Sequence, residues 1–236
     1  MSDQKILNIK ETFDLGVQNH QKNSLQDAQN YYQKVLKVDP NHLGALNNLG
    51  IIFKTLSEHQ KAKDFFEKTI ELDPNHINAH NNLGTIFKEW KENQKAKDCF
   101  EKAIELDPNY TDAHNNLGII FKELKENQKA KDCFEKAIEI NPNYANAHNN
   151  LGVMFKDLKE NQKAKDCYEK AIEINPNHVD ANNNLGIMFK ELGEIQKAKN
   201  CFNKVIKIYP NHANTYFNLA ILFKELGEDQ KAISYY

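Results

Sequence analysis

The sequence predicts an all-α protein, an α-solenoid of stacked antiparallel helix pairs. The main observation is a fixed period: residues 77–110 and 111–144 differ at only six of their 34 positions. Two residue types keep the same period along the chain, proline (Pro40, Pro74, Pro108, Pro142, Pro176, Pro210) and glycine (Gly16, Gly50, Gly84, Gly118, Gly152, Gly186). A period of this length indicates a repeat array, because one such repeat cannot bury its apolar face alone.

Each repeat is expected to contain two helices. In residues 77–110, apolar residues fall at helical spacing over 78–90 and again over 94–106, and residues 91–93 are predicted to form the turn between them. Pro108 ends the second helix, because proline disfavours a helical residue before it and donates no backbone hydrogen bond. Gly84 lies inside the first helix, where glycine costs roughly 0.5–1 kcal/mol relative to alanine. Its recurrence therefore predicts a close approach of the paired helices.

The repeats are predicted at 9–42, 43–76, 77–110, 111–144, 145–178 and 179–212, followed by a partial repeat at 213–236. Repeat position 1 is thus Ile77 in the third repeat. Together they are expected to make residues 1–236 a single array. The partial repeat lacks the helix that would cover its apolar face, so we expect a fragment of a longer protein, or self-association through this end.

Composition limits the classes of function. The chain has 236 residues and a formal net charge of −2, and all its basic residues other than histidine are lysine. This balance argues against general nucleic-acid binding, which favours a basic surface. No apolar run approaches the roughly 18 residues of a membrane helix, and no signal-peptide core is present. We therefore expect no membrane association and a cytoplasmic location, with a nuclear one as the alternative.

Cysteine and histidine recur in columns that could suggest metal or redox chemistry. Cys99, Cys133, Cys167 and Cys201 all occupy position 23 and are interpreted as buried, reduced packing residues. Seven of the nine histidines fall at position 4 (His80, His114, His148) or position 34 (His42, His76, His178, His212). One histidine per repeat cannot converge on a zinc ion, which needs donors about 2.0–2.1 Å away. No catalytic constellation stands out, so we expect no cofactor, no metal and no enzyme activity.

The chain resembles the tetratricopeptide repeat (TPR) family. The resemblance rests on Leu117-Gly118, Phe121, Ala130, Phe134 and on Ala137 and Pro142, which fill the family's characteristic positions, and it covers about residues 9–236. It implies a right-handed superhelix in which the first helices line a concave groove. It also implies a scaffold role, with an extended or helical segment of a partner protein bound in that groove.

The candidate groove residues are columns on the first helices. From the second repeat onward, position 6 is asparagine (Asn48, Asn82, Asn116, Asn150, Asn184, Asn218), position 5 adds amides (Asn81, Asn115, Asn149, with Asn47 and Asn183), and position 12 is lysine (Lys54, Lys88, Lys122, Lys156, Lys190, Lys224). An amide offers both a donor and an acceptor, so a ladder of them suits a polypeptide backbone. The lysines are expected to favour acidic segments. The simpler interpretation is a solvated helix face on a structural spacer that binds nothing.

The asparagine column also resembles that of the TPR superhelix in O-linked N-acetylglucosamine transferases. This resemblance implies an alternative function: the chain would be the N-terminal, substrate-recruiting arm of such an enzyme, with the catalytic domain beyond Tyr236. The TPR role of clamping acidic chaperone C-termini requires lysine at position 5 and asparagine at position 9. Those positions here hold mainly asparagine and aliphatic residues, so that role is not expected.

Overall fold

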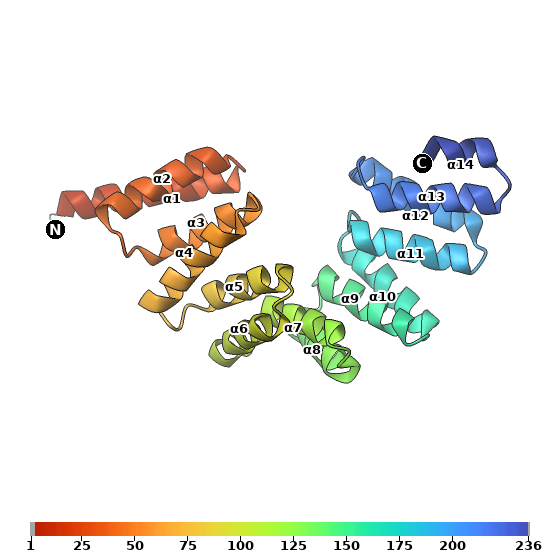
Figure 1. Ribbon diagram of the computed structural model, residues 1–236, viewed down its shortest axis with the longest axis horizontal. Coiled ribbons are helices and arrows are strands. Elements are labelled where there is room, and N and C mark those ends of the chain that lie inside the picture. The colour runs from red at the N-terminus through yellow and green to blue at the C-terminus, as the bar shows by residue number, and fades with distance from the viewer. Residues whose placement is uncertain (1–2, 236) are drawn as a thin grey trace. The chain divides into compact units, whose positions relative to one another are not determined.

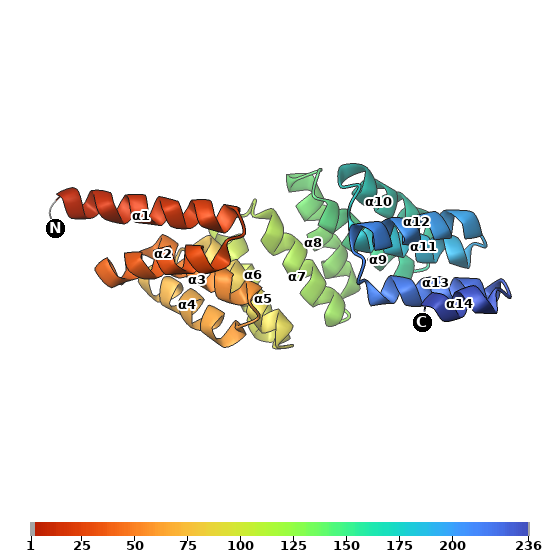
Figure 2. The same ribbon diagram turned by 90° about the horizontal axis from the view of Figure 1, so that it is seen from above.

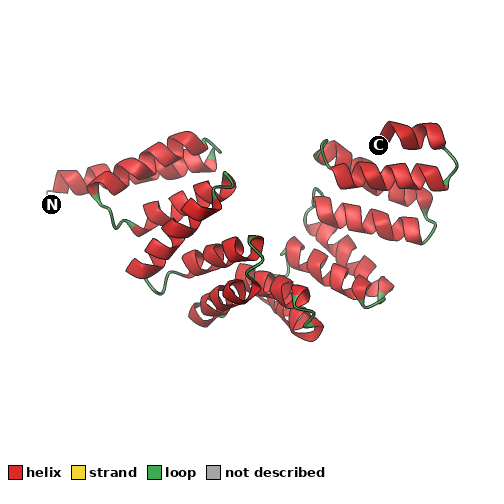
Figure 3. Ribbon diagram, in the orientation of Figure 1, coloured by secondary structure: helices red, strands yellow, loops and turns green. Residues whose placement is uncertain are grey.

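The computed structural model describes the backbone of residues 3–235 and the side chains of residues 8–235. That part of the chain forms fourteen helices and no strand (Figure 3). They are α1 (Asp3–Gln21), α2 (Leu25–Val38), α3 (Leu43–Thr55), α4 (His59–Leu72), α5 (Ile77–Glu89), α6 (Asn93–Leu106), α7 (Thr111–Glu123), α8 (Asn127–Ile140), α9 (Ala145–Asp157), α10 (Asn161–Ile174), α11 (Val179–Glu191), α12 (Ile195–Ile208), α13 (Ala213–Glu225) and α14 (Asp229–Tyr235). The predicted all-α class is confirmed.

The chain divides into two compact units, Met1–Ile120 and Phe121–Tyr236. In the N-terminal unit the pairs α1–α2, α3–α4 and α5–α6 pack together, and α2 and α4 also contact the first helix of the next pair (Figure 1). In the C-terminal unit the same pattern joins α9–α10, α11–α12 and α13–α14, with α10 and α12 contacting the pair that follows (Figure 2). The predicted stacking of consecutive helix pairs is confirmed within each unit. One array over residues 1–236 remains a prediction.

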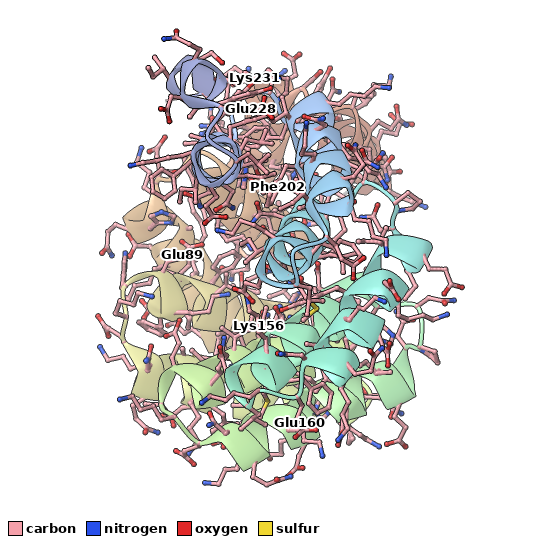
Figure 4. The ribbon with its side chains drawn as sticks, turned by 90° about the vertical axis from the view of Figure 1, so that its right-hand side faces the viewer. Glu89, Lys156, Glu160, Phe202, Glu228 and Lys231 are labelled. Atoms are coloured by element: carbon pink, nitrogen blue, oxygen red, sulfur yellow. The ribbon has the colours of Figure 1, made fainter. Side chains whose placement is uncertain are left out.

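The recurring glycine marks the place where the two helices of a repeat touch. A Cβ added to Gly84 would lie 2.7 Å from Cε1 of Phe100, a ring that is fully buried. The same contact is 2.6 Å between Gly186 and Phe202, and Figure 4 labels Phe202 among the helices of the C-terminal unit. Real Cβ atoms do not approach other atoms this closely, so the aromatic ring occupies the space that a side chain would need. The close approach predicted from the glycine column is confirmed.

The turn within each repeat has the expected length but begins one residue earlier than expected. Asn93, placed in the turn by the sequence, is the first residue of α6, while Trp90 follows the end of α5 and donates its backbone N–H to the Ile86 carbonyl at 3.1 Å. The chain reverses through a left-handed residue at position 15, where Lys91 has a φ of +62°. Gly193 and Gly227 occupy the same position in later repeats, with φ values of +74° and +70°. A single left-handed residue therefore suffices to join the two helices.

Both histidine columns have structural roles. At position 34, His42 precedes α3 and its Nδ1 accepts a hydrogen bond from the Ala45 backbone N–H at 3.1 Å, which caps the helix. His76 and His178 cap α5 and α11 in the same way. At position 4, His80 Nε2 lies 2.9 Å from the Pro74 carbonyl oxygen and ties the helix to the preceding turn. These are local contacts within a single polypeptide turn, far from the geometry of a shared metal.

A charged triad supports the other end of each pair. Lys163 Nζ lies 5.3 Å from the ring centroid of Phe155 and 2.5 Å from Glu160 Oε2. The arrangement recurs in the last repeat, where Lys231 pairs with Glu228 (Figure 4). A lysine over an aromatic face gains a cation–π contact of about 0.5–1 kcal/mol at exposed sites. Position 19 lysines thus belong to the helix pair and are distinct from the position 12 column.

Candidate functional site

The position 6 asparagines lie in the middle of the first helices, and all six are half-exposed. They occupy α3, α5, α7, α9, α11 and α13 (Asn48, Asn82, Asn116, Asn150, Asn184, Asn218). One turn further along, position 9 presents half-exposed residues that are mostly aliphatic, such as Ile51 and Val153. The first helices from α3 onward therefore offer solvent a narrow stripe in which an amide is followed by a residue that is mostly aliphatic.

Four of the five position 5 asparagines (Asn47, Asn81, Asn115 and Asn149) are buried and do not line that stripe, which corrects the prediction for them, whereas Asn183 is half-exposed. Asn81 and Asn149 are each 6% exposed, and Asn115 is 4% exposed. They are turned toward the neighbouring first helix, where the Nδ2 of Asn116 donates to Asn81 Oδ1 at 3.1 Å. Burial of an amide requires such a partner, because an unpaired buried polar group costs roughly 1–3 kcal/mol. Position 5 therefore supports the stripe from beneath.

The same amide–amide bond recurs in the C-terminal unit. Asn184 Nδ2 donates to Asn149 Oδ1, and Asn218 Nδ2 donates to Asn183 Oδ1, both at 3.1 Å. We call this bond an amide rung; it joins position 6 of one repeat to position 5 of the repeat before it. Each rung uses one of the two N–H groups of the position 6 amide. The ladder predicted from the sequence is thus partly bonded to itself, and the rungs fix the orientation of the amides that face solvent.

The position 12 lysines are also engaged with neighbouring repeats. Lys156 Nζ lies 2.9 Å from Glu191 Oε1, and Lys122 Nζ lies 3.1 Å from Asp157 Oδ2. The acidic partner is at position 13 of the following repeat, a column that the sequence analysis did not single out. Figure 4 labels Lys156 on its helix in the C-terminal unit. These pairs reduce the attraction for acidic segments that we expected from this column, because each charge already has a counter-charge. Of the other position 12 lysines, Lys88 and Lys190 are half-exposed, and Lys190 lies 3.7 Å from Glu225.

The amide rungs and the lysine–acid pairs both follow from one common offset between adjacent repeats. The rung joins residues 35 apart in sequence, as does the Lys156–Glu191 pair. Adjacent first helices are therefore out of register by one residue, so that position n contacts position n+1 of the next repeat. Lysine at position 12 followed by acid at position 13 is visible in the sequence, but the offset that pairs them is not.

The cysteines, interpreted from the sequence as buried packing residues, are half-buried. All four are free thiols, and burial is the largest cause that raises the pKa of Cys99 to about 12, with Asp98 and Glu67 adding to the shift. Burial likewise raises the pKa of Cys167 to about 11. Such thiols are protonated at neutral pH and make poor nucleophiles. Among the described residues, no group of three or more histidine, cysteine or acidic side chains is placed to hold a metal ion.

Comparison with known proteins agrees with this architecture. Family models described as tetratricopeptide repeat match residues 14–42, then 44–76, 77–110, 111–144 and 145–178, and finally 167–200 and 201–234. No curated protein sequence matches the chain. None of the described helices is both long and apolar enough to span a bilayer.

Solved structures share the fold. The crystal structure of MamA is 29% identical, with a TM-score of 0.58, and the match covers 70% of this chain and 91% of MamA. PilF of Pseudomonas aeruginosa is 19% identical with a TM-score of 0.76, covering 96% of this chain and 100% of PilF. YrrB, described as a TPR protein with an unusual peptide-binding site, is 24% identical with a TM-score of 0.54, covering 78% of this chain and 95% of YrrB. At such identities PilF and YrrB inform the fold alone. One family model alone matches residues 44–178, more than half of the sequence, and the chain belongs to the tetratricopeptide repeat family.

Proposed function

We propose that the stripe of position 6 amides binds an extended or helical segment of a partner protein. TPR proteins are typical protein-interaction scaffolds, and this chain repeats one half-exposed amide in six successive first helices. That repetition is the observation that carries the proposal. Within each unit, a half-exposed polar column that recurs once per repeat suits a ligand that is itself a chain of regularly recurring amides.

The spacing supports an extended ligand. Neighbouring helices pack about 8–10 Å apart, and an extended polypeptide advances about 3.3–3.6 Å per residue. Every third residue of such a ligand would therefore meet one position 6 amide. The rungs hold the amide of Asn184 in place by one N–H, and its carbonyl oxygen and second N–H can serve a backbone N–H and C=O of the ligand. Recognition of backbone by amides, with apolar contacts from position 9, would be tolerant of ligand sequence.

The test compares two matched sets of amide removals. We expect Asn82→Ala, Asn116→Ala and Asn150→Ala together to lower capture of peptides on a random 12-residue array and of proteins from a lysate. The control removes Gln94, Gln128 and Gln162, exposed amides that bond within their own second helices. Equal capture by both triple variants, with both folded by circular dichroism, would show that the stripe is not the binding surface.

A narrower proposal uses the same stripe. The asparagine column also suits the substrate-recruiting arm of an enzyme that resembles the O-linked N-acetylglucosamine transferases, with the catalysis outside this chain. The sequence of the full reading frame distinguishes the two proposals, since several hundred further residues with an α/β pattern would favour the enzyme arm. In both proposals the role of this chain is to bind.

Self-association is proposed for the face formed by α13 and α14. Ile233 is 65% exposed and Phe217 is 54% exposed, and both are large apolar side chains. Burial of such side chains stabilises an interface by about 25 cal/mol per Å² of apolar surface removed from water. Light scattering over a concentration series measures it, and a monomer at every concentration would contradict self-association.

A further inference from the structure

One rung is open in the N-terminal unit. By the 35-residue offset, Asn82 on α5 should donate to Asn47 on α3, as Asn116 does to Asn81. Instead, Asn82 Oδ1 accepts a hydrogen bond from Lys54 Nζ at 3.3 Å. Asn47 is 7% exposed, and its Oδ1 is buried without a hydrogen-bond partner among the described residues. A buried amide oxygen without a hydrogen-bond partner costs folding free energy. A hydrogen bond from Asn82 to Asn47 Oδ1 would therefore be stabilising if Asn82 became free to make it.

Lys54 also lacks the acidic partner that the same offset provides elsewhere. Its expected partner is Glu89, but Glu89 Oε2 lies 3.0 Å from Nδ1 of His59, at ion-pair distance although without hydrogen-bond alignment. No carboxylate of the described residues lies within 4.0 Å of Lys54 Nζ, in contrast to Lys122, Lys156 and Lys190 in the C-terminal unit. The one hydrogen bond found for the Lys54 ammonium is to a neutral amide.

The charges around Lys54 come from two helices. Glu89 and Lys88 face it from α5, and Asp112 faces it from α7. Burial is the largest influence and lowers the pKa of Lys54, Glu89 and Asp112 act to raise it, and Lys88 lowers it. A half-buried ammonium whose hydrogen-bond partner is neutral is stabilised strongly by a carboxylate that reaches it, because charge-assisted bonds are about twice as strong as neutral ones.

We propose that Lys54 is the anchor for a carboxylate of the bound segment, supplied by an acidic side chain or by a C-terminus. The inference rests on the proposed function and gives the stripe a fixed polar subsite in the N-terminal unit. When the Lys54 ammonium turns to the ligand carboxylate, Asn82 is released from its present donor. Its amide then rotates and donates Nδ2–H to Asn47 Oδ1, which closes the rung in the form seen at Asn116 and Asn81. Carboxylate binding and rung closure are thus coupled.

The test uses a 12-residue peptide array in which every acidic sequence is also made with Gln or Asn in place of Glu or Asp. A further set is made with an amidated in place of a free C-terminus. We expect Lys54→Met to weaken binding of the acidic peptides about tenfold, to the level of their neutral counterparts. Lys170→Met, which removes a lysine of α10 that already pairs with Glu173 at 3.0 Å and lies outside the stripe, should change binding less than about twofold. Loss on side-chain neutralisation assigns the anchor to an acidic residue, and loss on amidation assigns it to a C-terminus.

A second measurement follows the rung itself. In nitrogen-15 NMR spectra, the side-chain amide signals of Asn82 should shift when an acidic array peptide binds wild-type protein, and should not shift with the neutral counterpart. Equal losses for Lys54→Met and Lys170→Met, or equal binding of acidic and neutral peptides, would overturn the anchor while leaving the stripe as a binding surface. If wild-type protein binds no peptide of the array, the proposed function fails, and this inference fails with it.

Discussion

The contact between Gly84 and Phe100 predicts the effect of a Gly84→Ala substitution on stability. The substitution should destabilise the protein when the Phe100 ring is present and stabilise it when the ring is removed. Replacing Gly84 with alanine puts a Cβ 2.7 Å from Phe100 Cε1 and 2.9 Å from Cδ1, whereas ordinary contacts begin near 3.4 Å. The ring must therefore move by about 0.7 Å in a site that is fully buried, and overpacking of this kind costs about 1–3 kcal/mol. Because alanine has a higher helix propensity than glycine, the substitution also contributes about 1 kcal/mol of stabilisation. We expect a net loss of about 1 kcal/mol, and up to 2, in the free energy of unfolding.

The chain contains one tryptophan, Trp90, which lies in the turn that joins α5 to α6. Its fluorescence in a urea titration reports unfolding of this repeat, even where the array does not unfold in a single step. In a Phe100→Leu background the ring is absent, so Gly84→Ala should become stabilising by about 0.5–1 kcal/mol. Ala220→Gly, at the same position of the last repeat, provides the propensity control, with its unfolding followed by circular dichroism because Trp90 lies in another repeat. If Gly84→Ala stabilises the protein with Phe100 present, then steric contact does not explain the glycine column.

Three further predictions concern the turn, a helix cap and the thiols. Lys159→Gly should raise the free energy of unfolding by about 0.5–1 kcal/mol, because Lys159 has a φ of +63°, a conformation that glycine adopts without strain. Gly193→Lys should lower the free energy of unfolding by a similar amount. Urea titrations measure both effects, and unchanged midpoints for both variants would contradict backbone strain at this position. Burial lowers the pKa of His178, with Asp180 opposing it, so the cap is complete above the unfolded pKa of about 6.5 and is lost as pH falls through the folded value. The melting temperature should drop between pH 7 and pH 5, and the drop should be smaller in His178→Asn, whose cap does not titrate; equal drops would count against the cap. The raised pKa of Cys167, about 11, predicts slow alkylation by iodoacetamide at pH 8 compared with the urea-unfolded chain, and equal rates would refute it.

The sequence was sufficient for the parts of the molecule that depend on a single repeat. The 34-residue period and the apolar spacing located both helices of each pair to within a residue or so at most ends. The glycine column predicted the close approach that Phe100 and Phe202 confirm. These features follow from local sequence because helix propensity, turn residues and the buried face of one helix pair all lie within one repeat.

The contacts between repeats required the tertiary structure. Asn81 and Asn116 occupy neighbouring columns that helical spacing alone assigns to one face, yet the first is buried and the second is half-exposed. The one-residue offset between first helices makes this division, since it turns position 5 toward the next helix and pairs it with position 6. The same offset gives Lys156 its acidic partner. Near-identical repeats nevertheless differ at Lys54, where His59 draws the expected acid away. Helix register is set by how side chains of two repeats fit against each other, and no single repeat contains that information.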